Sequence, residues 1–343
     1  MKQKITIDDV ARAAGVSKQT VSRAINNKGE ISPKTRTRIL TLIEEMGYRP
    51  NRMAQAMNTS VSHMIGLVVP DITNPFFPEI VRAVQDAAMA NGYSTLICNT
   101  DEAPELEVLN ELVTHGIDGL ITFTHRANDQ DVSEFADRFG PMLIINREVE
   151  HPNITSLMVD NVDGACKAVE HLVELGHTTI GMLTTELESI SNTRRVQGFR
   201  KGLKAAGIPI DADLIVQADP TLAGGYAATM DLLRQRPDMT GLFTYNDLMA
   251  VGAMRACRDL GRDIPTEISV IGFDDIQIAS MVTPALSSIR VDKYEMGRLA
   301  FERMLQLIQK QTSDTATIKM EAELIAREST GPVPIQVAQS TVS

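Results

Sequence analysis

The chain has 343 residues, of which 43% are hydrophobic, and a formal net charge of −11 at pH 7. This length predicts two or three globular domains, and no apolar run approaches the roughly 18 residues of a membrane-spanning helix. Because acidic residues appear within the first nine positions, where a secretory signal would be apolar, we expect a cytoplasmic protein with no membrane partner. The three cysteines and six histidines lack Cys-x-x-Cys and His-x-x-x-His spacings, which predicts reduced thiols and no metal site.

The charge is distributed unevenly along the chain. Residues 1–60 hold 11 of the 33 lysines and arginines but only 5 of the 44 acidic residues, so this segment carries +6 and the remainder −17. A cationic head on an anionic body is typical of a protein that binds a polyanion at one end. The pattern indicates nucleic acid as the partner of the head and a different role for the body.

The head contains three predicted helices with clear ends. Thr6 is a favourable N-cap for a first helix that ends at Gly15, and Ser17 caps a second helix almost at once. A third helix is bounded by Ser32, with proline at the first helical position, and by Gly47. Apolar residues recur at helical spacing in all three segments. Two short helices joined by a tight turn and braced by a third form a helix-turn-helix.

The second helix of this motif would lie in the major groove of DNA. Its lysine and arginine suit guanine edges or phosphates, and Gln19 suits bidentate pairing with adenine. The side chains expected to contact DNA here are Ser17, Lys18, Gln19, Thr20, Ser22, Arg23 and Asn26. The alternative is a solvated polar face on an ordinary helical module, but the caps, the turn and the local charge agree with DNA binding.

Three segments of the head resemble the lactose/galactose repressor (LacI/GalR) family: TIDDVA at 6–11, GVSKQTVSR at 15–23 and GYRPN at 47–51. The resemblance implies that residues of about 50–58 form a hinge helix, which orders on operator DNA and inserts an apolar wedge in the minor groove. Met57 stands at the wedge, where family members usually carry leucine, and Asn51, Arg52 and Ala54 are the other DNA contacts expected of this segment. Without the resemblance, the segment is a polar linker that begins at a proline. Either interpretation ends the first domain near residue 60.

From residue 61 onward, short apolar runs alternate with amphipathic stretches. One series of strands is expected at 65–69, 95–98, 119–123 and 142–145, with helices near 78–91, 104–115 and 129–139. A second series is expected at 179–183, 214–216, 241–244 and 269–273, with helices near 161–175, 193–206, 223–235 and 247–260. Two such series predict two α/β lobes, each a doubly wound parallel sheet with helices on both faces.

Ligands of doubly wound sheets bind at the carboxyl ends of the strands. No glycine-rich phosphate loop and no Gly-x-Ser-x-Gly elbow stands at these ends, so we expect no cofactor and no enzyme activity. The ends instead carry Asn, Phe, Arg and Asp side chains, at 74–77, 146–147, 246–247 and 274–275. Carboxylates, amides, a guanidinium and aromatic rings together suit a neutral sugar. Each residue also has a structural interpretation: a helix cap for Asp247, core packing for the phenylalanines, and an ion pair with Glu148 or Glu150 for Arg147.

The family resemblance continues over nearly all of residues 5–330 and implies a core similar to periplasmic sugar-binding proteins. It implies effector contacts from Asn74, Phe76, Phe77, Arg147, Arg195, Asn246 and Asp274. Val291 and Asp219-Pro220 replace a glutamine and an aromatic residue that many relatives use, which leaves the identity of the ligand open. We assign 61–160 plus 291–322 to the first lobe, 161–290 plus 323–331 to the second, and 332–343 to a flexible tail. Since this tail lacks heptads, we expect a homodimer rather than a tetramer.

Together these features predict a sequence-specific DNA-binding transcriptional regulator, a repressor, that reads a pseudo-palindromic operator in double-stranded DNA as a homodimer. A small carbohydrate or related metabolite bound between the lobes would set its operator affinity. Two alternatives are control of the same architecture by a phosphorylated carrier protein, and a sugar-binding or sugar-acting α/β enzyme. Adjacent carboxylates such as Asp274 and Asp275 seldom face each other across a bond, which disfavours the enzyme. The sequence leaves the sign of control open.

Overall fold

A computed structural model describes residues 5–25, 31–48, 61–100, 103–124, 126–186, 189–312 and 315–333. Residue contacts divide the chain into two compact units, Met1–His63 and Met64–Ser343. The predicted hinge helix, with Asn51, Arg52, Ala54 and Met57, lies outside the described residues, as does Asn26 of the helix-turn-helix.

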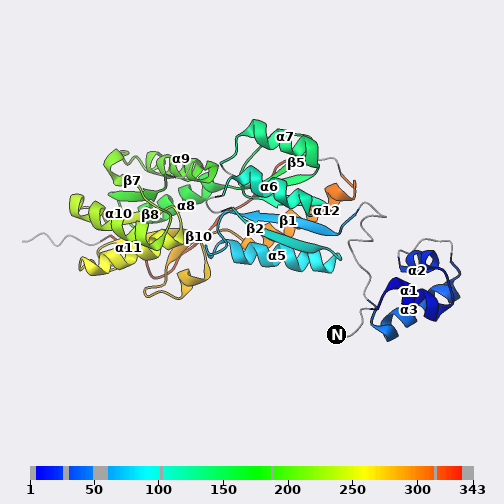
Figure 1. Cartoon of the computed structure of the whole chain (residues 1–343). Helices are drawn as coiled ribbons and strands as arrows, with labels where there is room; N and C mark the ends of the chain where they lie inside the picture. Colours follow the sequence, from blue (N-terminus) through cyan, green and yellow to red (C-terminus); the bar gives the residue numbers. More distant parts are fainter. Residues whose placement is uncertain are drawn as a thin grey trace, which may run out of the picture. The chain divides into compact units, whose positions relative to one another are not determined.

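The head consists of α1 (Ile7–Ala14), α2 (Lys18–Ile25) and α3 (Pro33–Met46) (Figure 1). Their apolar faces meet in a small core in which Val10, Val21 and Ile39 are fully buried. Each of these residues comes from a different helix, so the core forms only when all three helices pack together. The predicted helix-turn-helix is confirmed.

The ends of the head helices follow from their capping residues. Thr6 and Asp9 form a reciprocal capping box at the start of α1, and the side chain of Ser32 accepts a hydrogen bond from the backbone at the start of α3. Gly15 and Gly47 end α1 and α3 with φ angles of 62° and 64°. In this left-handed region a side chain would be strained, which explains why glycine stands at both ends.

The first lobe is built on a six-stranded sheet with the order β11-β5-β4-β3-β1-β2, and all of its strand pairs are parallel. Its central strands β3 and β4 are buried along their whole length, as their continuous apolar sequences require. The strands are β1 (Met64–Val69), β2 (Ser94–Asn99), β3 (Gly119–Thr122), β4 (Met142–Ile145), β5 (Ile154–Val159) and β11 (Ile318–Met320). The helices are α5 (Phe77–Ala90), α6 (Glu105–Thr114), α7 (Asp129–Phe139) and α12 (Lys293–Ile308).

The second lobe has a sheet of the same size with the order β12-β10-β9-β8-β6-β7, in which only the pairing of β10 with β12 is antiparallel among the described strands. The strands are β6 (Ile180–Thr184), β7 (Ile215–Gln217), β8 (Gly241–Thr244), β9 (Ser269–Asp274), β10 (Ser287–Arg290) and β12 (Glu323–Ile325). The helices are α8 (Asn161–Glu174), α9 (Ile190–Ala205), α10 (Leu222–Gln235) and α11 (Asp247–Asp259), with short turns η1 (Ala212–Leu214) and η2 (Gln277–Ser280). The predicted two-lobe α/β fold is confirmed.

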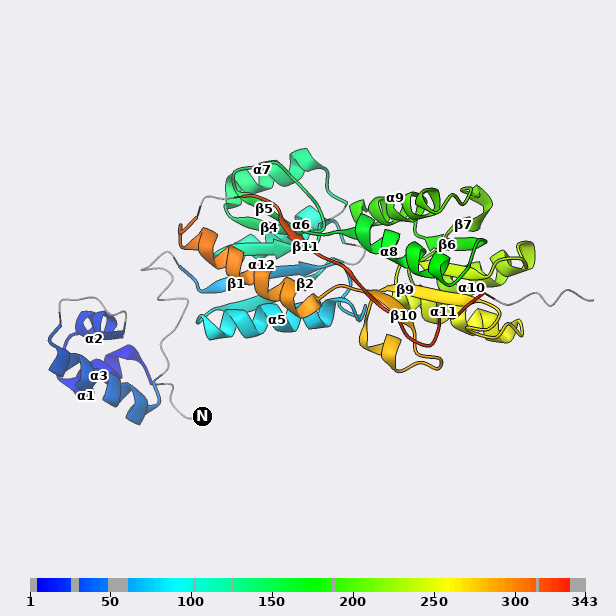
Figure 2. The ribbon, with the colours of Figure 1, turned by 180° about the vertical axis from the view of Figure 1, so that it is seen from behind.

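The chain passes between the lobes three times. It leaves the first lobe after β5, returns after β10 to form α12, and separates β11 from β12, which pair in different sheets. Helix α12 packs against α5 of the first lobe although it directly follows a strand of the second (Figure 2). Three crossings bring the segments that join the lobes close to the strand ends on both sides.

Among the described residues, four strands and one long helix were not predicted, and the strands either contain buried polar residues or are short. In β10, Ser287 and Ser288 are fully buried and their hydroxyls bond to Thr330 and Asp247, so the strand lacks an apolar run. In β5, the buried polar residues Thr155 and Ser156 also interrupt the apolar pattern. Strands β11 and β12 have only three residues each. Helix α12 does carry a helical stripe of buried apolar residues, so its sequence was sufficient to predict it.

None of the helices in the described ranges combines the length and the apolar character that crossing a membrane requires.

Candidate functional site

Helix α2 presents a polar face and buries an apolar one. Lys18, Gln19 and Arg23 are exposed, whereas Val21 and Ala24 are buried against α1 and α3. A helix that lies in the major groove needs one exposed polar face and one buried apolar face, because its donor side chains must reach the DNA while the apolar face packs against the rest of the domain. Lys18, Gln19 and Arg23 are therefore accessible for base or phosphate contacts.

The remaining candidates on α2 have local partners. The Oγ atom of Ser17 accepts a hydrogen bond from the backbone N–H of Thr20 at 3.1 Å, and the two hydroxyls lie 2.9 Å apart. Ser17 therefore caps α2, and its hydroxyl and that of Thr20 are engaged with each other. Ser22 is half-buried. Ser17 and Thr20 thus stabilise the start of α2, next to Lys18 and Gln19.

Two arginines of α3 fasten the helix-turn-helix from behind, which sequence reasoning missed. Arg38 donates from Nη2 to the carbonyl of Ala14 at 2.8 Å, and Arg36 donates from Nε to the carbonyl of Ala24 at 3.3 Å. Both carbonyls lie in the last turn of their helix, where no backbone donor is available and the helix dipole favours a cation. The two arginines thus hold α1 and α2 at a set spacing from α3.

In the core, Arg195 of α9 lies against Asp274 at the end of β9, both in the second lobe. Nη2 of Arg195 on α9 is 3.2 Å from Oδ1 of Asp274 at the end of β9, and Nε donates to Oδ1 of Asn161 at 2.8 Å. The guanidinium carbon lies 3.6 Å from the ring centroid of Phe273 and 4.7 Å from that of Tyr245, whose carbonyl accepts from Nη1. Arg195 is therefore held by hydrogen bonds and by two aromatic rings.

Burial controls the acidity of two carboxyl groups near Arg195. The pKa of Asp274 is raised, mainly because burial disfavours the charged form, while Arg195 and Lys293 act to lower it. The pKa of Asp247 is raised well above its ordinary value of 3.8, again mainly by burial and then by the charge of Asp274. Asp247 accepts from the hydroxyl of Ser288 at 2.6 Å and from the backbone N–H of Ile276 at 2.8 Å. Asp247 thus supports the segment that follows Asp274. It is not the cap of α11, which is Asn246.

Lys293 holds the turn that carries Asp274. Its Nζ atom donates to the carbonyls of Asp274, Asp275 and Val291 at 2.7, 3.0 and 3.2 Å, and the side chain is 5% exposed. Asp274 and Asp275 adopt φ angles of 104° and 49°, a strained left-handed geometry that turns two successive carbonyls toward the ammonium. Nζ also lies 3.9 Å from Oε2 of Glu79 on α5. Lys293 was not predicted, because its bonds to Asp274 and Asp275, 19 and 18 residues away, form only in the folded chain.

Asn74 and Asn246, both expected effector contacts, have local hydrogen bonds. The Oδ1 atom of Asn74 accepts from the backbone N–H of Phe76 at 3.0 Å and forms a tight turn before α5. The Oδ1 atom of Asn246 caps α11 through the N–H of Met249 at 2.9 Å, and its Nδ2 donates to the carbonyl of Pro220 at 3.0 Å. Both side chains therefore shape the strand ends on which they stand.

The aromatic and basic candidates of the first lobe lie in separate clusters. Phe76 and Phe77 are each 8% exposed, belong to the hydrophobic core and pack edge to face with ring centroids 5.2 Å apart. Arg147 is 9% exposed and donates to the carboxylate of Asp129 and to the carbonyl of Ala127. Its partner is thus neither of the glutamates considered from the sequence. Of the seven expected effector residues, Arg195 contacts Asp274 and Phe76 contacts Phe77.

An ion pair and two hydrogen bonds connect the strand-end segments of the two lobes. Arg194 on α9 lies 2.9 Å from Glu148, which follows β4 of the first lobe. Lys293, at the start of α12 in the first lobe, donates to the carbonyls of Asp274 and Asp275 at the end of β9 in the second. The carboxyl ends of both sheets therefore border the same region, where a ligand of a doubly wound fold is expected to bind.

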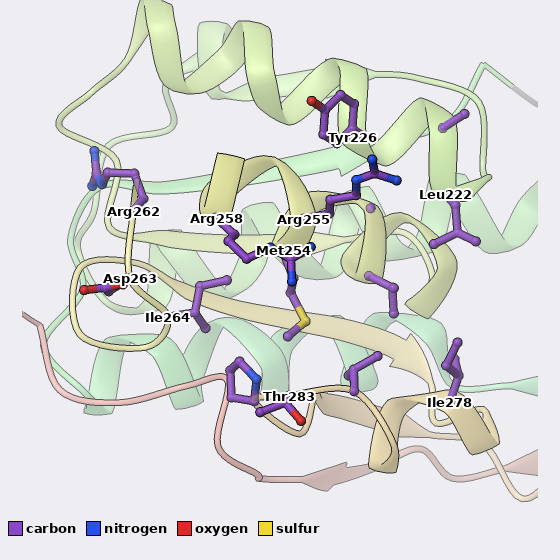
Figure 3. Close-up of a pocket in the computed structure, with 15 residues that line it drawn as sticks. Leu222, Tyr226, Met254, Arg255, Arg258, Arg262, Asp263, Ile264, Ile278 and Thr283 are labelled. Atoms are coloured by element: carbon purple, nitrogen blue, oxygen red, sulfur yellow. The ribbon is translucent and has the colours of Figure 1, made fainter. Parts of the chain in front are cut away.

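A second feature of the core is a groove of about 910 Å³ in the second lobe, and none of the expected effector residues lines it. Figure 3 shows side chains from α10, α11 and the segment after β9 around this groove. Leu222, Met254 and Ile278 give it an apolar lining, and Arg255 and Arg258 lie beside it. Leu222 is 47% exposed and Met281, next to the lining segment, is 66% exposed. An apolar groove bordered by exposed apolar side chains can mark a contact site, whereas single exposed residues do not.

No group of three or more His, Cys, Asp or Glu side chains suited to a metal ion occurs in the part of the chain that the structure describes.

A helix-turn-helix head and a two-lobe α/β core with buried polar groups at its strand ends define a class of protein, the ligand-controlled DNA-binding regulators. Residues 6–51 match the model of bacterial regulatory proteins of the lacI family, and residues 169–330 match a periplasmic binding protein-like domain. The transcriptional regulator GalS of Salmonella typhimurium is 37% identical over 327 residues, or 95% of this chain and 96% of that protein.

Two solved structures are similar to this chain. The first match covers nearly all of the chain, and the second covers about four fifths of it. The lac repressor dimer bound to operator and the anti-inducer ONPF has a TM-score of 0.85 and 32% identity, and the match covers 96% of this chain and 100% of that one. A LacI family regulator from Enterococcus faecium with bound ribose has a TM-score of 0.73 and 30% identity, and the match covers 79% of this chain and 99% of that one. The chain belongs to the lacI family: it is a DNA-binding transcriptional regulator and not an enzyme.

Proposed function

We propose that this regulator is a homodimeric repressor whose affinity for a pseudo-palindromic operator is set by a small carbohydrate bound between its two lobes. The observation that carries the proposal is the buried pair formed by Arg195 of α9 and Asp274 at the end of β9. A protein seldom buries two charged side chains without using them, because removing both from water is costly. Because the operator is chromosomal DNA, we place the protein in the cytoplasm.

The chemistry around this pair suits hydroxyl groups. The described contacts use three of the five N–H donors of Arg195, which leaves two for a ligand. Among the described residues, Oδ1 of Asp274 accepts from Arg195, so Oδ2 remains as an acceptor for a ligand hydroxyl. The rings of Phe273 and Tyr245 orient the guanidinium and add apolar surface beside it. The similar regulator from Enterococcus faecium is a structure with bound ribose, which supports a monosaccharide-sized ligand.

On the DNA side, we propose that α2 lies in the major groove and that Lys18, Gln19 and Arg23 contact bases and phosphates. Their exposure on a helix whose other face is buried supports this placement. The hinge segment with Met57 would add minor-groove contacts, as the family resemblance implies.

For the dimer, we propose that the groove bounded by α10, α11 and η2 forms part of the contact between two copies. Exposed Leu222 and Met281 beside an apolar groove favour burial against a partner. A two-fold axis there would also bring two heads to the two halves of one operator. The similar lac repressor structure is a dimer bound to operator.

Control follows if the ligand favours one arrangement of the lobes over another. The ion pair of Arg194 with Glu148 and the hydrogen bonds of Lys293 to the carbonyls of Asp274 and Asp275 connect the lobes beside the proposed site, so a ligand there would alter their relative positions. We propose that this shift changes the spacing of the two hinge segments and thereby their ability to bind operator together. The change in the free energy of operator binding cannot exceed the difference between the ligand's binding free energies for the two arrangements.

A thermal-shift screen with pentoses, hexoses and their phosphates, followed by operator binding, tests this function. A ligand that binds only the folded protein raises its melting temperature. At least one sugar should do so and should also change the affinity for a duplex from the region upstream of the gene. Arg23→Ala should weaken binding to that duplex while sugar binding remains. Stabilisation by a phosphorylated carrier protein and by no sugar would contradict the carbohydrate proposal.

A further inference from the structure

The carboxylate of Asp275, next to Asp274, is held by two arginines from different parts of the second lobe. Its Oδ2 atom accepts from Nε of Arg290 at 2.8 Å, and its Oδ1 atom lies 2.7 Å from Nη2 of Arg327. The side chain of Asp275 is 7% exposed and that of Arg327 is 18% exposed. Such a carboxylate is fixed in position, because moving it away from either arginine would leave charge unpaired and out of water.

Both arginines lie where the chain passes between the lobes. Arg290 is the last residue of β10, directly before the segment that returns to α12. Arg327 lies just after β12, the strand that follows the third crossing, and its Nη1 atom donates to the carbonyl of Leu286 at 2.7 Å. Nη1 of Arg290 lies 4.0 Å from Oε2 of Glu323, the first residue of β12. Asp275 thus ties the end of β9 to two of the three connections.

The backbone of Asp275 is bound on both sides as well. Its N–H donates to Oγ of Ser288 on β10 at 3.1 Å, and its carbonyl accepts from Lys293 of α12 in the first lobe. Its φ angle of 49° lies in the left-handed region, which a residue other than glycine keeps only when its surroundings hold it there. The turn that carries Asp274 is therefore stiff relative to the segments that join the lobes.

A stiff turn at this place affects how well a ligand distinguishes two arrangements of the lobes. A sugar bound between the lobes would contact Asp274 on one side and the first lobe on the other. If the lobes rotate while the turn keeps its place at the connections, the carboxylate of Asp274 moves relative to the first lobe, and one arrangement binds the sugar better. A loose turn would follow the sugar in both arrangements. The two affinities would then be alike, and a ligand with equal affinity for both states shifts nothing.

We propose that Asp275 is a positioning residue for the effector response: by fixing the turn of Asp274 to the connections between the lobes, it makes sugar affinity differ between the two lobe arrangements. This role depends on the carbohydrate-controlled function proposed above. It gives Asp275 an effect on the coupling between sugar and operator, separate from the sugar contact assigned to Asp274.

The test measures operator binding by full-length wild type, Asp275→Asn and Asp211→Asn, using fluorescence anisotropy with and without saturating sugar. D-ribose and D-galactose are the first probes, followed by any other sugar that raises the melting temperature of wild type in the thermal-shift screen. For Asp275→Asn, the ratio of the two dissociation constants should move toward one by at least about twofold, the smallest effect expected of a coupling residue. Asp211→Asn, which removes a carboxylate that binds Arg236 elsewhere in the second lobe, should keep the wild-type ratio.

Measuring at saturating sugar separates coupling from damage to the binding site. A variant whose site is merely weakened binds the sugar less tightly in both arrangements, so it needs more sugar but reaches the same final ratio. By reciprocity, the sugar affinities of the free and the operator-bound protein must differ by the same reduced factor in Asp275→Asn. Without sugar, this variant should bind the operator as wild type does, because the arginine contacts lie within the second lobe, which both arrangements share.

An unchanged ratio in Asp275→Asn, or a fall that comes only from a change in the sugar-free affinity, would overturn the proposal. Arg290→Gln is a second variant for the case in which the asparagine prevents folding. Its side chain is 44% exposed, so the fold should tolerate the change, and losing one of the two charges on Asp275 should lower the ratio in the same direction. A wild-type ratio in that variant would overturn the proposal too. If no sugar changes operator binding by wild type, the proposed function fails, a result distinct from these.

Discussion

Replacing Lys293 with methionine tests whether the turn at Asp274 depends on a buried ammonium. The substitution keeps most of the side-chain volume but removes the donor to three carbonyls, those of Asp274, Asp275 and Val291. Leaving three buried acceptors unpaired costs about 1 to 3 kcal/mol each, while relief from burying a charge offsets several kcal/mol of that total. The expected net loss in the free energy of unfolding is about 3 kcal/mol. For a core of this size, the melting temperature should fall by roughly 6 to 12 °C.

Scanning calorimetry of wild type, Lys293→Met and Lys319→Met measures this loss. Lys319 is an exposed lysine on β11 of the first lobe, so its replacement controls for removing a positive charge. Its expected effect is within about 0.5 kcal/mol of zero. If Lys293→Met were as stable as this control, the turn at Asp274 would not depend on the ammonium, and the description of the site would be wrong.

Three further changes probe the head, the buried carboxyl and the dimer. Arg38→Met should destabilise the head by about 1.5 kcal/mol, because the carbonyl of Ala14 loses a charged donor; hydrogen exchange of α1 amides in the full chain measures it, and unchanged protection would contradict the bond. Because burial raises the pKa of Asp247 above 3.8, its carboxyl contributes stability when protonated and loses it as pH rises from about 4 through the raised pKa. The unfolding free energy of wild type minus that of Asp247→Asn should thus decrease with rising pH in denaturant titrations, and a flat difference would refute the shift. Leu222→Glu should dissociate the dimer in sedimentation equilibrium, whereas Ile210→Glu, which alters a similarly exposed side chain, should not; two dimeric variants would exclude the groove as the interface.

The head was predictable because its signals are local. The cap at Thr6 and the glycine at position 15 lie within one turn of the helix ends that they define, and the structure places both as expected. The hydrogen bonds of Arg36 and Arg38 to the preceding helices were not predictable, because the carbonyls that accept them lie 12 and 24 residues earlier in the chain. Nothing in the local sequence distinguishes these two arginines from exposed ones.

In the core, the alternation of apolar and amphipathic segments was enough to predict two lobes, but the polar site required tertiary contacts. Arg195 and Asp274 are 79 residues apart, and only the resemblance to known regulators suggested that they share a function. Lys293 had no such signal, since a lysine at the start of a helix is ordinarily solvent-exposed. Asn161 escaped notice for a similar reason: it follows the cap of α8, and its bond to Arg195 appears only in the folded chain.

The most direct test of the central claim is the dissociation constant of the upstream duplex, measured with and without the sugar that stabilises the protein, for wild type and Asp274→Ala. The account predicts a shift of about fivefold or more for wild type, the usual lower range of such coupling. In Asp274→Ala the sugar-free affinity should stay close to wild type and the shift should disappear. A variant that responds to the same sugar concentrations as wild type would contradict the assignment of Asp274 to the effector site.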